Sequence, residues 1–269
     1  MEIIQSVLNG ILLGGLYSGD LVIVSTFLCM IIAAQVTGSL LLALVITICF
    51  MAVIGFLLQN FLINKVLDKG DEPPLLVTFG VSIFLSNVLL LLFGADARSI
   101  QSPITSSNVI SSNLVSVSAV YLLNFVVAVL VIGALHYVMK YTYFGRSIRA
   151  TSNDVTAAEL MGVNTKRIYS YTMCLAMASA AIAGLLVGMT FVFYPSTGTQ
   201  YLIIAFGVVV IGGMGSLLGT LVGGVILGLA QLLGAYFFGA GYQLLAGYIV
   251  LLIILTIKPE GLLSTAARK

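Results

Sequence analysis

The regularly spaced polar side chains inside the apolar stretches of this chain are hydroxyls and amides. Thr78, Ser82 and Ser86 recur every four residues, so they share one face of a helix, and Asn87 lies beside them. Asn124 lies within another apolar stretch. Such groups could line the path of a neutral or zwitterionic solute, or they could form hydrogen bonds between helices. The sequence leaves both interpretations open.

Patterns typical of catalysis, metal binding or cofactor binding are missing from the sequence. No nucleophile stands beside a base, and no cluster of His, Cys, Asp and Glu has metal-ligand spacing. The glycine-rich segment Ile211–Thr220, IGGMGSLLGT, lacks the Lys that a phosphate-binding loop requires. The sequence therefore predicts that this chain is not an enzyme and binds neither a metal nor a cofactor.

One polar segment interrupts the apolar sequence. Gly145–Arg167, GRSIRATSNDVTAAELMGVNTKR, has four basic and two acidic residues, whereas 7% of the whole chain is charged. Ser152, Asn153 and Asp154 are typical helix N-caps, and Gly162 is a typical helix end. We therefore expect VTAAELM to form a two-turn helix, which would be marginal alone in water. It lacks the aromatic anchors of a helix that lies on a membrane, so a groove on another protein is the favoured partner.

The composition places the rest of the chain in a membrane. Of 269 residues, 60% are hydrophobic, and so few charges cannot cover a soluble surface. The apolar stretches are long and uninterrupted, which predicts an all-α, polytopic transmembrane helical bundle. A span needs about 20 residues. Candidate spans are Leu40–Leu58, Leu75–Phe93, Val117–Met139, Ile168–Phe193, Leu217–Leu233 and Tyr242–Ile257.

Three further apolar stretches are too short to cross comfortably. Leu202–Ile211 is expected to be a half-helix or a tilted piece. It leads into the glycine-rich segment, which predicts a break between membrane helices. The residues expected to form this break are Gly212, Gly213, Gly215 and Gly219. At the beginning, Ile3–Tyr17 and Leu21–Ala34 are predicted as two segments on either side of Ser18-Gly19-Asp20.

The positions of Lys and Arg predict the orientation. Basic residues collect in the loops Gln59–Pro74 and Lys140–Arg167 and after Lys258, so these parts are expected to be cytoplasmic. The N-terminus would then lie outside, provided that both short initial segments cross. No charged residue lies centrally in a well-defined span, and Asp20 is the one ambiguous case. This disfavours a proton- or sodium-coupled transporter or a channel.

The polar segment resembles the cytoplasmic coupling loop of ABC importer permeases of the branched-chain amino acid type. The resemblance continues through PLLVTFGVSIFLSNVLLLLFG, through FGVVVIGGMGSLLGTLVGGVILG, and to KPEGLL near the C-terminus. It therefore covers most of the chain, which would form a single transmembrane permease domain, residues 1–269, in a bacterial cytoplasmic membrane. The loop 140–167 would contact the ATPase, with Arg146, Arg149, Asp154, Ala157, Ala158, Glu159, Leu160 and Gly162 as its coupling residues.

The resemblance also implies the partners. A second, homologous permease would complete the membrane pathway, two cytoplasmic ATPases would bind ATP and Mg, and an extracytoplasmic binding protein would deliver the solute. Branched-chain or related amino acids are the expected solutes. Urea, short amides, simple sugars and nucleosides are carried by related permeases and stay as alternatives.

One departure from the family concerns the beginning of the chain. Family members continue from a motif like GGLYS through a full apolar helix and a segment resembling NFAHG. Here Ser18 is followed directly by GDLVIVSTF, so about twenty residues, enough for one crossing, are missing. An inactive, deleted copy of a permease is therefore a further alternative.

Overall fold

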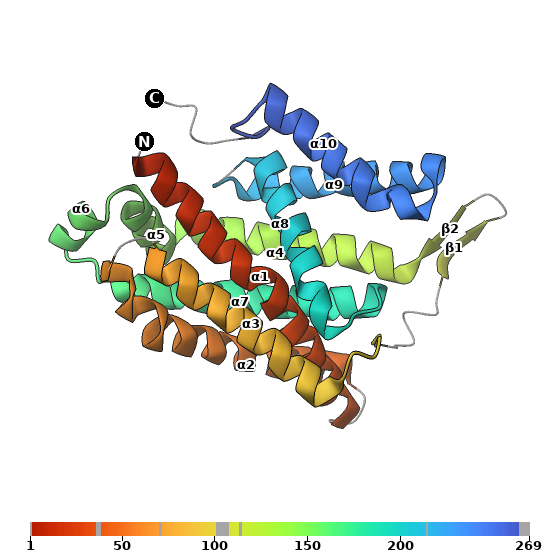
Figure 1. Ribbon diagram of the computed structural model, residues 1–269, viewed down its shortest axis with the longest axis horizontal. Helices are drawn as coiled ribbons and strands as arrows, with labels where there is room; N and C mark the ends of the chain where they lie inside the picture. The colour runs from red at the N-terminus through yellow and green to blue at the C-terminus, as the bar shows by residue number, and fades with distance from the viewer. Residues whose placement is uncertain are drawn as a thin grey trace. The chain divides into compact units, whose positions relative to one another are not determined.

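The structure is a computed structural model that describes residues 2–35, 39–69, 72–100, 108–112, 115–213 and 215–263. The α-helices of these residues are α1 (Glu2–Gln35), α2 (Leu40–Phe61), α3 (Glu72–Phe93), α4 (Ala119–Tyr141), α5 (Tyr143–Asn153), α6 (Val155–Leu160), α7 (Thr165–Thr190), α8 (Gly198–Gly212), α9 (Leu217–Phe238) and α10 (Gln243–Ile257). Short 3₁₀ helices are η1 (Ile63–Lys65), η2 (Leu67–Lys69), η3 (Pro195–Thr197) and η4 (Ala240–Tyr242). Figure 1 shows their order along the chain.

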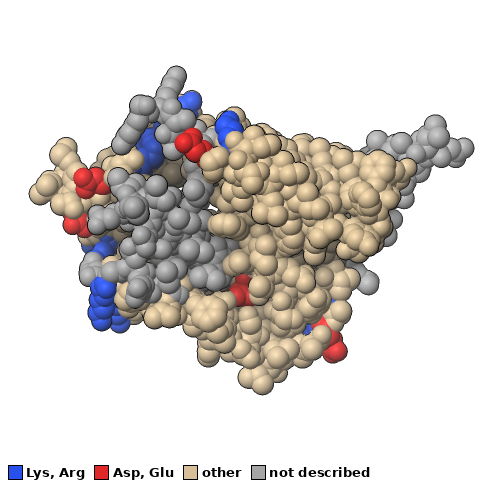
Figure 2. Space-filling view, turned by 45° about the horizontal axis from the view of Figure 1, so that its top comes forward, with Lys and Arg blue, Asp and Glu red and all other residues tan. Residues whose placement is uncertain are grey.

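The predicted helical membrane bundle is confirmed. Among the described residues, seven segments are long and apolar enough to span a membrane. They contain α2, α3, α4, α7, α8, α9 and α10. Two short strands, β1 (Asn108–Ser112) and β2 (Val115–Ser118), pair as an antiparallel hairpin before α4. Figure 2 shows the expected surface, with wide areas free of Lys, Arg, Asp and Glu.

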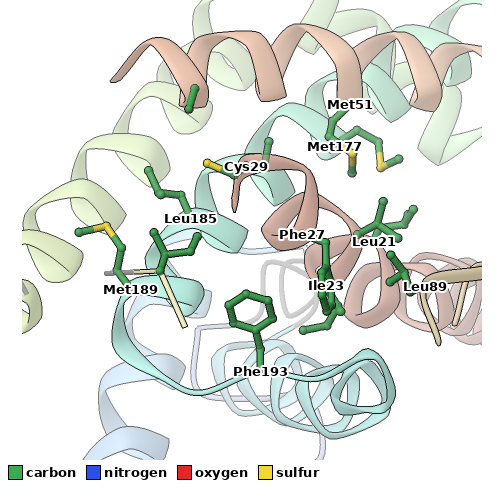
Figure 3. Close-up of a cluster of buried hydrophobic side chains, with 14 of the residues drawn as sticks. Leu21, Ile23, Phe27, Cys29, Met51, Leu89, Met177, Leu185, Met189 and Phe193 are labelled. Carbon is green, nitrogen blue, oxygen red and sulfur yellow. The ribbon is translucent and has the colours of Figure 1, made fainter. Parts of the chain in front are cut away.

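The first of two compact units, Met1–Ala128 with Val138–Leu202, packs α1, α2, α3 and α7 against one another. Its core surrounds Phe27 of α1, which is fully buried (Figure 3). The Phe27 ring stacks on Phe93 with centroids 4.6 Å apart and meets Phe193 edge-on at 5.1 Å. Aromatic pairs at such distances add to the area that they bury.

Small residues let α7 approach its neighbours in this unit. A side chain at Gly184 would meet the carbonyl oxygen of Val22 at 2.8 Å, and one at Gly55 of α2 would meet Met177 at 2.6 Å. Hydroxyls then bridge the helices: Ser25 donates to the Ala180 carbonyl and Thr26 to the Gly184 carbonyl, both at 3.0 Å. Close backbones and bridging hydroxyls are the contacts that hold helices together in lipid, where hydrophobic burial contributes little.

The second compact unit, Val129–Tyr137 with Ile203–Lys269, contains α9, α10 and most of α8. Helices α9 and α10 lie side by side (Figure 1). Gly234 of α9 has no room for a side chain because Ala246 of α10 occupies that position. With 15 residues, α8 is about 22 Å long, shorter than the roughly 30 Å of hydrocarbon. With η3 before it, α8 lies in the 18-residue apolar segment Pro195–Gly212, which is long enough to span a membrane, so the expectation that this stretch is too short to cross was wrong.

The prediction of two short segments at the beginning of the chain was wrong. Helix α1 is continuous from Glu2 to Gln35, 34 residues through Ser18, Gly19 and Asp20. Gly19 packs against the carbonyl oxygen of Gly198, and Asp20 is buried. Gly19 and Asp20 therefore lie in a packed helical turn, and residues 18–20 do not separate two segments.

Candidate functional site

The polar segment folds into two helices with defined caps. Thr142 caps α5 by accepting from the backbone N–H of Gly145 at 3.1 Å. Asp154 caps α6 by accepting from that of Ala157 at 3.0 Å. Gly162, with a φ of +84°, follows the last turn of α6. Of the three capping candidates in the sequence, Ser152 and Asn153 belong instead to the end of α5.

Helix α6 and the residue after it expose a small apolar surface, the Leu160–Met161 knob. Leu160 is 83% and Met161 85% exposed, and Ala157 and Glu159 are exposed as well. Ala158 is only 4% exposed within the chain, and its role in a contact with a partner stays a prediction. Ala158 lies one turn after Asp154, on the face of α6 that packs against the rest of its own chain. The free contact surface is the Leu160–Met161 knob.

Two basic residues of this segment contact other residues of the chain. Arg149 donates to the Met139 carbonyl at the end of α4. The guanidinium of Arg146 lies over the ring of Tyr143, 5.9 Å from its centroid. Both residues therefore have contacts within the chain that brace α5.

A chain of hydrogen bonds connects the end of α6 to α7 and α2, and no pattern along the sequence predicted it. Thr165 donates to Glu159 at 2.6 Å, at the beginning of α7. Asn64 donates to the carbonyl of Lys166 and to Ser170, both at 3.3 Å, and accepts from Gln59 of α2 at 3.0 Å. Gln59, Asn64 and Ser170 are buried, so these hydrogen bonds join α7 to α2 in the interior of the first compact unit.

The predicted polar face of α3 is directed partly toward α1. Thr78 is fully buried, Ser86 is half-buried, and Ser82 donates a hydrogen bond to the carboxylate of Asp20. Asp20, the ambiguous residue of the sequence, is 7% exposed and belongs to the interior of α1. The structure therefore adds a carboxylate to the hydroxyls that were expected to line a solute path.

The two predicted amides lie elsewhere. Asn87 is exposed and donates to the Ile83 carbonyl of its own helix at 2.7 Å. Asn124 of α4 donates to Thr190 of α7 at 2.6 Å. Asn124 thus forms the interhelical hydrogen bond that was the alternative interpretation, and neither amide joins Asp20 and Ser82.

The glycine-rich segment forms a tight connection between α8 and α9. Gly213 and Gly215 have φ of +98° and +85°, values that side chains other than that of Gly rarely allow. Gly212 at the end of α8 and Gly219 in α9 touch through their backbones, so a side chain on either would overlap the other. The predicted break residues therefore lie together.

The C-terminal segment KPEGLL covers the end of α8. The backbone N–H groups of Leu262 and Leu263 donate to the carbonyls of Ile211 and Gly212 at 2.9 and 3.0 Å. The last carbonyls of a helix have no partner within it. The tail supplies those partners, so the chain itself packs against the end of α8 beside the glycine break.

Within the described residues, no group of three or more His, Cys, Asp and Glu could hold a metal ion. The site thus consists of a membrane helix bundle with the exposed Leu160–Met161 knob and the buried contact between Ser82 and Asp20.

Comparison with known proteins decides the family. Residues 8–257 match the family described as the permease component of branched-chain amino acid transport systems. The chain belongs to this family. The permease is 31% identical to the high-affinity branched-chain amino acid transport system permease protein BraD of Pseudomonas aeruginosa, over 88% of this chain and 79% of that protein. It is 28% identical to the LivH permease protein of the same kind of system in Escherichia coli, over 97% and 95% of the two chains. No solved structure matches it.

Membership explains why the permease is a transport subunit and not an enzyme. It also bears on the beginning of the chain. The alignment with the E. coli protein extends over 292 positions, whereas this chain has 269 residues. The relative therefore has at least 23 residues for which this permease has no counterpart, and a lost segment next to Ser18 stays a prediction.

The contact of Gly212 with Gly219 can be tested by adding one methyl group. We expect Gly219→Ala to destabilise the permease by about 1–3 kcal/mol, because the new Cβ meets backbone that cannot rotate away. Thermal unfolding in detergent would measure the loss. The matched control is Gly228→Ala in the same helix, where nothing lies within 4 Å of the new Cβ. Equal effects of the two changes would contradict the assigned contact.

Proposed function

We propose that this permease is the membrane-spanning subunit of an ATP-driven ABC importer that carries branched-chain amino acids into the cell. The observation that supports the proposal most directly is the family match over residues 8–257, together with relatives whose names state this transport. The solute is proposed from those names.

The partners are two cytoplasmic ATPases, a second permease and an extracytoplasmic binding protein. The exposed Leu160–Met161 knob supports the first of these, because a water-facing apolar surface of this kind suits a groove on another protein. The ATPase would move α6, and the hydrogen bonds through Glu159, Thr165 and Asn64 would carry that displacement to α7 and α2.

The continuous α1 changes the proposed orientation of the N-terminus. The basic loops around Lys65 and Lys140 and the tail after Lys258 stay cytoplasmic. One crossing by α1, in place of two, then puts the N-terminus on the cytoplasmic side as well.

Thiol labelling tests this orientation. Ser99 and Ser152 are both exposed, Ser99 after α3 and Ser152 in α5. In intact cells, we expect Ser99→Cys to react with a membrane-impermeant maleimide and Ser152→Cys to react only after the cells are opened. The unmutated chain, whose Cys29, Cys49 and Cys174 lie in membrane helices, gives the background. The reverse labelling pattern would overturn the orientation.

The knob is tested by ATP-driven uptake of leucine into vesicles that contain the permease with its ATPases and binding protein. We expect Leu160→Asp to lower both ATPase co-purification and uptake roughly tenfold or more, because it places a charge in a desolvated apolar contact. Membrane insertion should not change, since α6 lies outside the spans.

Two further variants serve as controls for Leu160→Asp. Ser152→Asp adds the same charge at an exposed position of α5, and Leu160→Met keeps the contact apolar; both should retain uptake. Full association of the ATPase with the Leu160→Asp permease would rule out the knob, and absence of leucine uptake by the unmutated complex would rule out the proposed solute.

A further inference from the structure

Asp20 is an ionisable side chain inside the first compact unit of a membrane protein. It is 7% exposed, and its helix α1 runs on for 15 residues, about 22 Å, to Gln35. Lys and Arg of the described residues lie in loops, in the cytoplasmic segment or at helix ends. A carboxylate inside a membrane helix is costly, and such residues commonly mark a solute or ion path.

Three elements meet at this carboxylate. Ser82 of α3 donates a hydrogen bond to Oδ2 of Asp20. The other oxygen, Oδ1, lies so close to Gly198 that any side chain at position 198 would overlap it. Gly19, next to Asp20, is equally close to the carbonyl oxygen of Gly198. The glycines on both sides therefore leave room for the carboxylate between α1, α3 and the beginning of α8.

The beginning of α8 decides which chemical class suits this place. Gly198 is the first residue of this 15-residue helix, and the N-terminus of a helix carries a partial positive charge. A bare cation next to Asp20 would be repelled by that charge. A zwitterion satisfies both groups, with its ammonium on Asp20 and its carboxylate toward the backbone N–H groups of α8.

We propose that Asp20, positioned by Ser82, binds the ammonium group of the amino acid as it crosses the permease. The inference rests on the proposed function for the class of solute. When the solute enters, the Asp20 carboxylate moves away from Gly198. The ammonium group of the solute then neutralises the negative charge of the carboxylate, in place of the partial positive charge at the N-terminus of α8. The neighbouring hydroxyl of Ser82 stays as the partner that orients the carboxylate.

Binding to the purified, full-length permease in lipid nanodiscs tests this site without the ATPase. The probes are L-leucine, isoamylamine, which keeps the ammonium, and 4-methylpentanoate, which keeps the carboxylate. We expect leucine to raise the temperature of unfolding more than either analogue does. Asp20→Asn, which keeps the size but removes the charge, should weaken leucine binding roughly tenfold or more.

Two matched controls separate binding from folding. Thr47→Val also removes a buried polar atom, from a hydroxyl that donates to the Ala43 carbonyl of its own helix at 2.7 Å, and should leave leucine binding unchanged. If Asp20→Asn fails to fold, Gly198→Ala tests the same place, because its methyl group displaces the carboxylate without removing the charge. Its control is Gly80→Ala in α3, where nothing lies within 4 Å.

Several outcomes would overturn the inference. They are unchanged leucine binding by both Asp20→Asn and Gly198→Ala, isoamylamine binding as tightly as leucine, and no binding of any probe by the unmutated permease. ATP-driven uptake separates this inference from the proposed function. Normal leucine uptake by a complex with Asp20→Asn would remove the role of Asp20 and leave the importer intact. Leucine binding that depends on Asp20, without ATP-driven uptake, would keep the role of Asp20 and overturn the proposed importer function.

Discussion

Hydrocarbon offers no hydrogen-bond partner to a polar group, so a chain that spans a membrane must provide those partners itself. The helices meet most of this demand through their own backbones. The remaining groups are met between elements: Ser25 and Thr26 donate to carbonyls of α7, and the tail at Leu262 and Leu263 donates to the end of α8. Asp20 is the costliest of these groups. Its contacts with Ser82 and Gly198 therefore tie together α1, α3 and α8.

Glycine makes these contacts between backbones possible. At Gly184 the backbone of α1 packs closely against α7, and at Gly55 the side chain of Met177 packs against α2. At Gly219 the end of α8 packs against α9. Because packing at short range holds membrane helices together, the residues without side chains determine where two helices cross. Gly228 and Gly80 show that not every glycine has this role, since a side chain on either would meet nothing within 4 Å.

The segment outside the spans follows the rules of a water-facing helix. Asp154 and Gly162 define the ends of α6, and Ala158 fastens it to the chain. The exposed Leu160 and Met161 are left for a partner. The hydrogen bonds that Asn64 makes with Gln59 and with the Lys166 carbonyl join α7 to α2. The contact surface and the membrane helices are thus parts of one connected structure.

Features that depend on neighbouring residues along the chain were predictable from the amino-acid sequence. Long apolar stretches predicted the spans, capping residues predicted α6, and a run of glycines predicted the break between α8 and α9. Which groups meet between helices is known from the folded structure alone. It placed Asp20 beside Ser82, turned Ala158 inward, directed Asn87 away, and laid the C-terminal tail on α8.

It also joined two short apolar stretches into one α1, because Gly19 and Asp20 are accommodated by Gly198, a residue almost 180 positions away. Local patterns record the preference of each segment for helix and lipid. They carry no information on which distant backbone will lie against a given glycine or carboxylate, since that depends on how all the helices pack at once.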